Sequence, residues 1–379
     1  MRIAFYTYDL CPGREFLMPW RTILEVAKVM TTEGHDTLVL NACYDENIRK
    51  DYEWRGVAIK ALPTGFDILA TELVASDADV VFVPFTWRDG LKDLSIFNRV
   101  KCKKIAYMAG GVYDLKSVWT LLRSSGRAWA KPYLIESLAP KGLFVKAIKA
   151  AGFSCVIGLT ELTAEAARKS GFDDSYAIYP GNDAFEEIEP NDEVLIKYNL
   201  KGKKWLLFSG APAAYRGAEV LLQAVDKAKD DSIRLVMLMR TDVGSQYEKF
   251  EETLAKMKHP ERVQIVKERV TREQLRAFFG EAWYALLPFI VIPSEVPLTY
   301  FELLSCGTPV ITFKNGGTTE YLKDGLVIAD KSVKGLAKAL GEAWKDEALR
   351  VRLSENGSKI MAAHPTWEQV GKEWIKLLK

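Results

Sequence analysis

Residues 284–321 read YALLPFIVIPSEVPLTYFELLSCGTPVITFKNGGTTEY, and this stretch decides the fold. The apolar run 284–292 predicts a buried strand, and 309–313 predicts a second one. Between them we expect a helix that opens at Pro297, because the first helical N–H has no intrahelical partner and proline loses little there. Gly307 suits the position just after the helix, where left-handed backbone is common. The stretch therefore predicts a strand–helix–strand unit of a parallel sheet.

The loops of this unit carry polar groups suited to a ligand. The triplet NGG at 315–317 predicts a turn, after which Thr318 or Thr319 would cap another helix. Open α/β sheets bind ligands at the carboxyl ends of their strands, and helix N-termini at that edge suit phosphate. The carboxylates of Glu295 and Glu302 would stand beside bare backbone amides. Such a site suits a ligand with both hydroxyls and a diphosphate, and a nucleotide sugar has both.

Length and composition set broad limits. A chain of 379 residues is long enough for two α/β domains, and 48% apolar with 27% charged residues is ordinary for a soluble globular protein. The net charge of +2 gives no argument for nucleic acid. Five scattered cysteines without a CxxC pair fit a reducing compartment and argue against a zinc site. The start reads as a strand rather than a signal peptide, and no stretch is long and apolar enough to span a bilayer, so we expect a cytoplasmic protein.

Strands alternate with helices along both halves, which predicts two doubly wound, Rossmann-like α/β domains. The run ADVVFVP at 78–84 lacks polar alternation, as a parallel strand buried on both faces demands. The acidic run DAFEEIEPND at 183–192 is the best candidate for a linker, and the pattern restarts with WLLFS at 205–209. We therefore expect an N-terminal domain over 1–183 and a C-terminal domain over 184–363.

Several segments resemble one family of enzymes. LLFSGAPAAYRGAEVLLQAV at 206–225 is similar to the first strand, loop and helix of the C-terminal domain in GT-B glycosyltransferases of family 4, also called group 1. SEVPLTYFELLSCGTPVITFKNGGTTEYLKDG at 294–325 resembles the acidic motif of that family and its Gly-Gly turn. HPTWEQVGKEWIKLL at 364–378 resembles its terminal helix, which implies that 364–379 packs back on the first domain. The resemblance covers nearly the whole chain and is thinnest between 44 and 150.

The resemblance implies a GT-B fold with the active site between an acceptor-side N-terminal domain and a donor-binding C-terminal domain. The reaction it implies is transfer of a sugar from a nucleotide sugar to a hydroxyl acceptor, either a glycan or a lipid-linked molecule. It also implies retention at the anomeric carbon, no metal ion, and no cofactor beyond the donor. Two alternatives stay open, a nucleotide-sugar epimerase of the same fold and a non-catalytic nucleotide-sugar-binding protein.

The resemblance also assigns roles to residues. Glu302 would hold the ribose hydroxyls, Glu295 would hold the donor-sugar hydroxyls, and Arg216 would meet the diphosphate, so that Glu295 and Arg216 are the catalytic candidates. Each residue also has an alternative interpretation without a ligand. Glu295 is then a solvated loop acid, Glu302 is a first-turn carboxylate that interacts favourably with the helix dipole, and Arg216 is surface charge beside a turn. The donor-binding candidates are Glu302, Arg216, Gly210, Leu298, Thr299 and Gly13, and the acceptor-side candidates are Gly110, Gly111 and Tyr113.

The chain departs from the family pattern in the acidic motif and in a histidine. The family usually places seven residues between its two glutamates, whereas six separate Glu295 from Glu302, so that a strict count puts Ser294 at the first position. Many relatives place a histidine near the donor sugar, but the corresponding segment here reads MAGGVYD at 108–114. The identity of the first acidic position therefore stays open.

A further departure concerns the charge near the diphosphate. The family often has arginine directly after the glycine of the first strand in the C-terminal domain, whereas here Ala211 follows Gly210. Arg216 would then carry more of the diphosphate charge alone, unless Arg14 or Arg240 assists. An arginine is well suited to bidentate phosphate bonding.

The segment 116–153 carries seven basic residues against one acidic residue, Glu136, which leaves a net charge of −4 on the rest of the chain. Aromatic residues such as Trp119 and Trp129 are interleaved with the charges. A basic, aromatic, partly amphipathic segment can lie on an anionic membrane surface. We therefore expect peripheral contact with the inner face of a membrane through 116–153, with a solvated helical pair as the alternative.

Overall fold

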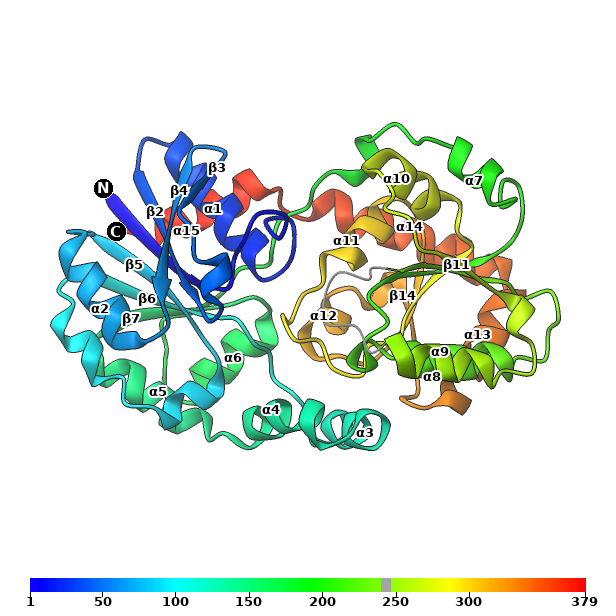
Figure 1. Ribbon diagram of the computed structural model, residues 1–379, viewed down its shortest axis with the longest axis horizontal. Helices are drawn as coiled ribbons and strands as arrows, with labels where there is room; N and C mark the ends of the chain where they lie inside the picture. Colours follow the sequence, from blue (N-terminus) through cyan, green and yellow to red (C-terminus); the bar gives the residue numbers. More distant parts are fainter. Residues whose placement is uncertain (240–246) are drawn as a thin grey trace.

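The computed structural model describes residues 1–239 and 247–379, which form two α/β domains side by side (Figure 1). Each domain has one mainly parallel sheet with helices on both faces. This confirms the predicted fold class of two doubly wound domains.

The sheet of the first domain has the strand order β3-β4-β2-β1-β5-β6-β7-β8. All its neighbouring strands run parallel except β3, which is antiparallel to β4. The strand β1 is buried almost throughout, as expected for a central parallel strand with helices on both faces. The strands are β1 (Arg2–Tyr8), β2 (Asp36–Cys43), β3 (Tyr52–Trp54), β4 (Val57–Pro63), β5 (Val80–Phe85), β6 (Lys103–Met108), β7 (Phe153–Gly158) and β8 (Ser175–Ala177).

The helices of the first half pack on this sheet, except for a pair that projects from it. Thr160 caps α6 by accepting a hydrogen bond from the backbone N–H of Thr163. The helices are α1 (Trp20–Thr32), α2 (Phe66–Ala75), α3 (Leu115–Ser125), α4 (Arg127–Leu138), α5 (Lys141–Ala150) and α6 (Glu161–Lys169), with the 3-10 helices η1 (Glu46–Ile48), η2 (Trp87–Leu91) and η3 (Ser95–Arg99).

The sheet of the second domain is parallel throughout its described part, with the order β11-β10-β9-β12-β13-β14. The strands are β9 (Leu206–Gly210), β10 (Leu235–Met239), β11 (Val263–Val266), β12 (Tyr284–Leu287), β13 (Val310–Phe313) and β14 (Leu326–Ala329). The helices are α7 (Glu193–Lys197), α8 (Ala218–Asp226), α9 (Tyr247–Ala255), α10 (Arg272–Glu281), α11 (Leu298–Ser305), α12 (Gly316–Tyr321), α13 (Val333–Lys345), α14 (Glu347–Ala363) and α15 (Trp367–Lys376), with η4 (Phe185–Glu187), η5 (Ala214–Arg216), η6 (Pro260–Arg262) and η7 (Lys323–Gly325).

The chain crosses between the domains at two adjacent segments. After α14, residues 364–366 lie beside residues 180–182, with Asn182 N–H donating to the carbonyl of Pro365 at 3.0 Å. The last helix, α15, then packs against α1, and Trp374 is buried in the core of the first domain. These paired crossings form a double connection between the domains.

The helices α3 and α4 form a hairpin that extends from the first domain and reaches beneath the second (Figure 1). Leu121 and Ala130 of this hairpin are buried in a hydrophobic cluster otherwise built from the second domain. Trp129 also lies against Tyr215, with ring centroids 6.5 Å apart. A hairpin from the acceptor side therefore packs on the donor side.

Three local predictions in the stretch 284–321 were wrong. The strand predicted over 284–292 ends at Leu287, because Pro288 offers no N–H to the ladder and the chain turns there. The helix α11 begins at Leu298, and Pro297 is its N-cap rather than its first residue. The helix α12 begins at Gly316, so Thr318 and Thr319 lie inside it and do not cap it.

Among the helices within the described residues, none has the length and apolar character needed to cross a lipid bilayer.

Candidate active site

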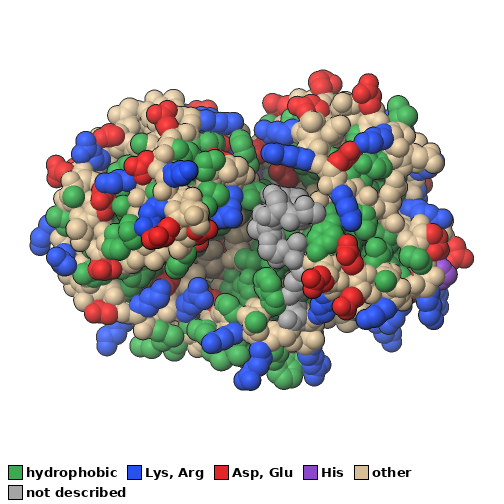
Figure 2. Space-filling model, in the orientation of Figure 1, with side chains coloured by type: hydrophobic (Ala, Val, Ile, Leu, Met, Phe, Trp, Pro, Cys, Tyr) green, Lys and Arg blue, Asp and Glu red, His purple; other side chains and the backbone are tan. Residues whose placement is uncertain are grey.

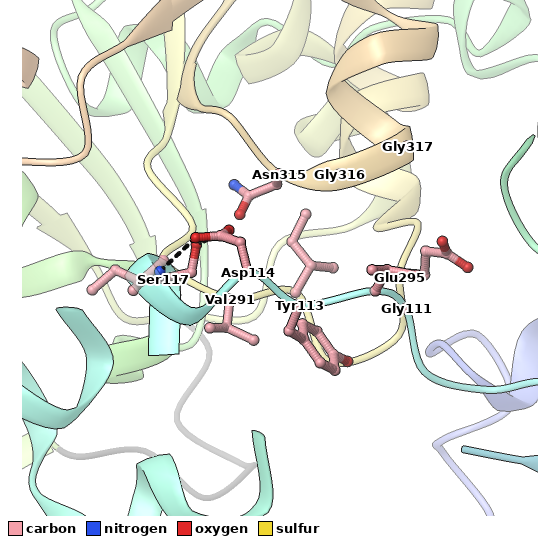
Figure 3. A pocket seen from close by; sticks show the side chains of 12 residues that line it. Gly111, Tyr113, Asp114, Ser117, Val291, Glu295, Asn315, Gly316 and Gly317 are labelled. Carbon is pink, nitrogen blue, oxygen red and sulfur yellow. Dashed lines mark hydrogen bonds between the residues drawn. The ribbon is translucent and has the colours of Figure 1, made fainter. Parts of the chain in front are cut away.

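A pocket lies where the two domains meet. One wall is the loop after β6 together with the start of α3, and the other is formed by the loops after β12 and β13 (Figure 3). Figure 2 shows the surface hollowed between the two halves of the molecule. The pocket is lined by Gly111, Val112, Tyr113, Asp114, Ser117, Ile290, Val291, Ile292, Glu295, Asn315, Gly316 and Gly317.

Arg216 lies at the end of η5, in the turn that follows β9. Its side chain packs against Gly210, where an added Cβ would lie only 2.3 Å from Nη1 of Arg216. The guanidinium lies 5.6 Å from the centre of the Phe289 ring, and within the described residues its buried Nε has no hydrogen-bond partner. Gly217, which follows, has an added-Cβ position 2.2 Å from the carbonyl oxygen of Pro288. The two glycines therefore allow the Arg216 turn to sit tightly against the loop after β12.

The loop after β12 leads into the helix α11, which begins at Leu298. Because β9 and β12 are parallel neighbours, the first turn of α11 and the Arg216 turn lie at the same carboxyl edge of the sheet. Its N-cap, Pro297, makes no side-chain cap, so the amides of the first turn, including those of Leu298 and Thr299, receive no bond from a capping side chain. Glu302 lies one turn further along and is half-buried. This arrangement offers an anion site beside a carboxylate.

Glu295 is the most unusual residue of the pocket. Its backbone has a φ of 59°, which is left-handed and rare for a residue with a side chain. Its side chain is 6% exposed and accepts hydrogen bonds on Oε1 from the hydroxyls of Thr160 and Thr163, both in the first domain. Burial raises the pKa of Glu295 to about 7, against the opposing effect of the two threonine hydroxyls.

The acceptor-side candidates lie at the end of β6. An added Cβ on Gly111 would stand 3.1 Å from Cγ of Glu295, so the missing side chain allows the two domains to approach closely. The Tyr113 hydroxyl donates to the carbonyl of Pro293 at 3.0 Å, across the domain boundary, and burial raises the pKa of this phenol. Gly110 lies just behind, beside the Tyr113 hydroxyl.

Not every predicted residue lies in the pocket. Gly13 does not line it; its backbone has a φ of 92°, and its N–H donates to the Glu15 carboxylate at 2.7 Å. Arg14 donates to the carbonyl of Asp9. Arg240 lies outside the described residues. The structure thus brings Gly111, Tyr113 and Glu295 together in the pocket and places Gly210 and Arg216 beside the adjoining loop.

Sequence reasoning missed Lys331, which follows β14. Its ammonium donates to the carbonyl of Ile290 at 3.1 Å, to Oδ1 of Asn315 at 3.4 Å, and to the hydroxyl of Ser117 in the first domain. Burial lowers its pKa to about 8, although Asp114 nearby favours the charged form. The only signal in the sequence is its position just after a strand, at the edge where ligands bind.

No group of three or more His, Cys, Asp or Glu side chains suited to a metal ion occurs in the parts of the chain that the structure describes.

Comparison with solved structures defines the fold. The sucrose-phosphate synthase from Thermosynechococcus elongatus superposes with a TM-score of 0.75 at 15% identity, covering 99% of this chain and 98% of that one. HepE from Anabaena, crystallised with UDP-glucose, superposes with a TM-score of 0.72 at 14% identity, covering 100% of this chain and 99% of that one. The chain therefore has the GT-B fold of these glycosyltransferases.

Comparison of sequences gives a family match for the second domain. Residues 191–360, most of the second domain, match the family of glycosyl transferases group 1. The spore coat protein SA of Bacillus subtilis (strain 168) is 24% identical over 196 residues, which is 49% of this chain and 51% of that protein. The match thus spans about half the length of this curated relative. The second domain of this chain is therefore similar to the group 1 glycosyl transferases.

Proposed function

We propose that this protein transfers a glycosyl group from a nucleotide sugar to a hydroxyl acceptor. One observation carries the proposal. In a domain that matches the group 1 family, Arg216 and the uncapped first turn of α11, which leads to Glu302, follow the carboxyl ends of two neighbouring parallel strands.

Each group has a chemical task in this reaction. The leaving diphosphate develops negative charge as the glycosyl bond breaks, and a fixed guanidinium with helix N-terminal amides stabilises that charge most in the transition state. Glu302 accepts hydrogen bonds from the ribose hydroxyls, and Glu295 is the candidate for the donor sugar. Because Arg216 and these amides supply the positive charge, we propose a transfer that needs no metal ion. By resemblance to family 4, we propose retention at the anomeric carbon.

A thermal-shift screen of nucleotide sugars against free nucleotides tests this function. Bound donor stabilises the folded protein by mass action, about 2.7 kcal/mol at a hundredfold excess over the dissociation constant. UDP-sugars come first, because HepE was crystallised with UDP-glucose. We expect Glu302→Gln and Arg216→Met each to weaken the shift.

Matched controls are Arg99→Met and Glu252→Gln, which change exposed residues outside the pocket. A donor shift that is unchanged in both site variants contradicts the site. Analysis of the products separates the alternatives, because a transferase makes a glycoside and a nucleoside diphosphate, an epimerase makes an isomeric donor, and a binding protein makes neither.

The hairpin bears on the acceptor. Six of the seven basic residues in 116–153 are exposed, whereas the one acid, Glu136, is 6% exposed and accepts hydrogen bonds from the backbone N–H groups of Trp87 and Arg88. Large apolar side chains are exposed on the same helices, and an apolar groove of about 890 Å³ runs between α3 and α4. Figure 2 shows green and blue side chains together along the lower edge, where these helices lie. The exposed apolar residues are Leu115, Trp119, Trp129, Leu134, Ile135, Leu138 and Leu143.

A surface with exposed apolar side chains, rimmed by basic groups and without an exposed acid from its own segment, complements an anionic lipid surface. We therefore propose that the protein acts at a membrane surface on a lipid-linked acceptor. The hairpin would dock there beside the pocket, with no spanning helix.

A further inference from the structure

The apolar groove between α3 and α4 begins beside the pocket between the domains. Asp114 and Ser117, at the start of α3, line that pocket. Lys116 and Val118, from the same turn of the helix, line the groove. A single turn of α3 therefore has the pocket on one side and the groove on the other.

The groove has the size and the lining of a site for a hydrocarbon chain. Its volume of about 890 Å³ falls within the range of small-molecule sites, roughly 300–1,000 Å³. Of the side chains that line it, Val118 and Ala130 are buried, whereas Trp119 and Leu134 are 54% and 40% exposed. No acidic side chain is among the described residues that line it. Apolar surface of this kind is stabilised when a hydrocarbon chain covers it.

Positive charge gathers where the groove meets the pocket. Lys116 lies there and is exposed. Burial lowers the pKa of Lys331 in the second domain, and the charge of Lys116 lowers it further, although Asp114 opposes both effects. Two ammonium groups that repel each other favour an anion beside them. A ligand that fits the groove therefore carries negative charge at the end that faces the pocket.

We propose that the groove binds the hydrocarbon chain of one lipid molecule whose phosphate lies at Lys116, so that the polar end of this molecule enters the pocket between the domains. The ligand class is a lipid phosphate, and only its role as carrier of the acceptor rests on the proposed function. A neutral hydrocarbon would bring no anion to Lys116, and free phosphate would leave the apolar lining in water. The site takes up one lipid molecule, whereas docking on a membrane uses the outer surface of the hairpin.

Alkyl phosphates of eight, ten and twelve carbons, kept as monomers, test the site by isothermal titration calorimetry in the absence of a nucleotide sugar. Each methylene that enters the groove should tighten binding about fourfold, as expected for the burial of one CH₂ group. Decyltrimethylammonium, which has the chain of decyl phosphate but the opposite charge, should bind far more weakly.

Two variants separate the chain from the phosphate. Ala128→Phe places a ring in the groove from an exposed helix position, and Lys116→Met removes the charge of a residue that lines it. Ala128→Phe should weaken the binding of dodecyl phosphate about fifteenfold, the effect of two excluded methylenes. Lys116→Met should weaken all three alkyl phosphates about fivefold and leave the dependence on chain length unchanged.

The matched controls are Ala362→Phe on α14 and Lys146→Met on α5, which change exposed residues that do not line the groove. The proposal is overturned if affinity does not rise with chain length, if Ala128→Phe and Lys116→Met bind as the wild type does, or if vesicles bind while monomeric alkyl phosphates do not. Because the titration contains no nucleotide sugar, its failure would remove this site and leave the transfer reaction standing. Failure of the donor shift would remove the transfer reaction and leave the lipid site standing.

Discussion

Glu295 is a candidate for binding the donor sugar and also makes a contact between the two domains. The family resemblance implies that Glu295 binds the donor sugar, and this role stays a prediction. In the structure its carboxylate instead accepts hydrogen bonds from Thr160 and Thr163 at the start of α6. Burial costs the charged carboxylate more free energy than the neutral carboxyl, because the anion loses its hydrating water. Protonation should therefore influence whether the domains stay closed.

We expect closure to weaken as the pH rises from about 4.5 to about 7. Glu295 has a pKa of about 7 in the closed structure and an ordinary value near 4.5 when hydrated, so the closed form binds more protons in this window. Above pH 7 the penalty on closure reaches about 3 kcal/mol. The neighbouring phenols of Tyr113 and Tyr179 have raised pKa values and stay neutral throughout, while Glu161 of α6 and Glu320 of α12 are exposed.

Scattering measured between pH 5 and pH 7.5 checks this expectation. The radius of gyration should increase with pH for the wild type and change less for Glu295→Gln, which cannot ionise. Identical pH profiles for the two proteins would assign the effect to other groups.

At the scale of elements, the hairpin of α3 and α4 is the clearest case of a segment with two faces. Its inner side chains, such as Leu121 and Ala130, are buried against the second domain, whereas its outer side chains are apolar and basic. A lipid-facing role and a domain-bridging role are therefore compatible. The local sequence gives the charge and the aromatic residues but not the choice of partner for each face.

We expect the double variant Lys116→Glu with Lys131→Glu to bind anionic vesicles much more weakly. Each basic residue near an anionic surface contributes on the order of 1 kcal/mol, so loss of two should lower the partition coefficient by about thirtyfold, and the two added carboxylates should lower it further. Co-sedimentation with phosphatidylglycerol vesicles at low salt measures this. Trp119→Ser should also reduce binding, through loss of an exposed apolar anchor.

The control is Lys334→Glu with Lys338→Glu, the same charge change on exposed residues of α13. Equal binding of both double variants would show that net charge, and not the hairpin, governs the interaction. Wild-type protein that ignores anionic vesicles would remove the membrane from the proposal.

At the scale of the whole molecule, the double connection between the domains centres on His364. Its Nε2 lies 2.7 Å from the carbonyl of Pro180, and its Nδ1 lies 2.7 Å from the hydroxyl of Tyr321. A neutral ring satisfies both, donating at Nε2 and accepting at Nδ1. Nearby, Asp183 accepts from Arg21 and from the indole of Trp367, so the crossing is also tied to α1 and α15.

We expect His364 to make unfolding pH-dependent. Burial lowers its pKa to about 4 from an ordinary value of 6.5, so the unfolded chain binds more protons between these values. The contribution is fully present above pH 6.5 and is lost as the pH falls towards 4, by about 3 kcal/mol. Denaturant unfolding across this range should show the loss in the wild type.

His364→Gln is the comparison, because an amide can donate and accept at similar positions without titrating. Since Glu295 acts in the opposite direction over part of the same range, the informative quantity is the difference in unfolding free energy between wild type and variant. A difference that does not vary with pH would contradict the assignment to His364.

The sequence by itself determined the features that local patterns encode. Apolar runs and the 3.6-residue period predicted two doubly wound domains, and Gly307 does follow α11 with a φ of 75°. Family resemblance added the GT-B fold and the group 1 assignment. Local patterns were misleading where a loop imitates a strand, as in the apolar segment after Pro288, which is buried without joining the sheet, and at the starts of α11 and α12.

Only the tertiary structure decided which groups meet across the cleft. Glu295 and Thr160 are 135 residues apart in the chain, and Lys331 and Ser117 are 214 apart, so no local pattern links them. Their pairing follows from the angle between two separately formed sheets and from glycines that let the loops touch. The alternation of strands and helices is a property of neighbouring residues, whereas the contact of Glu295 with Thr160 and Thr163 depends on how two folded domains fit together.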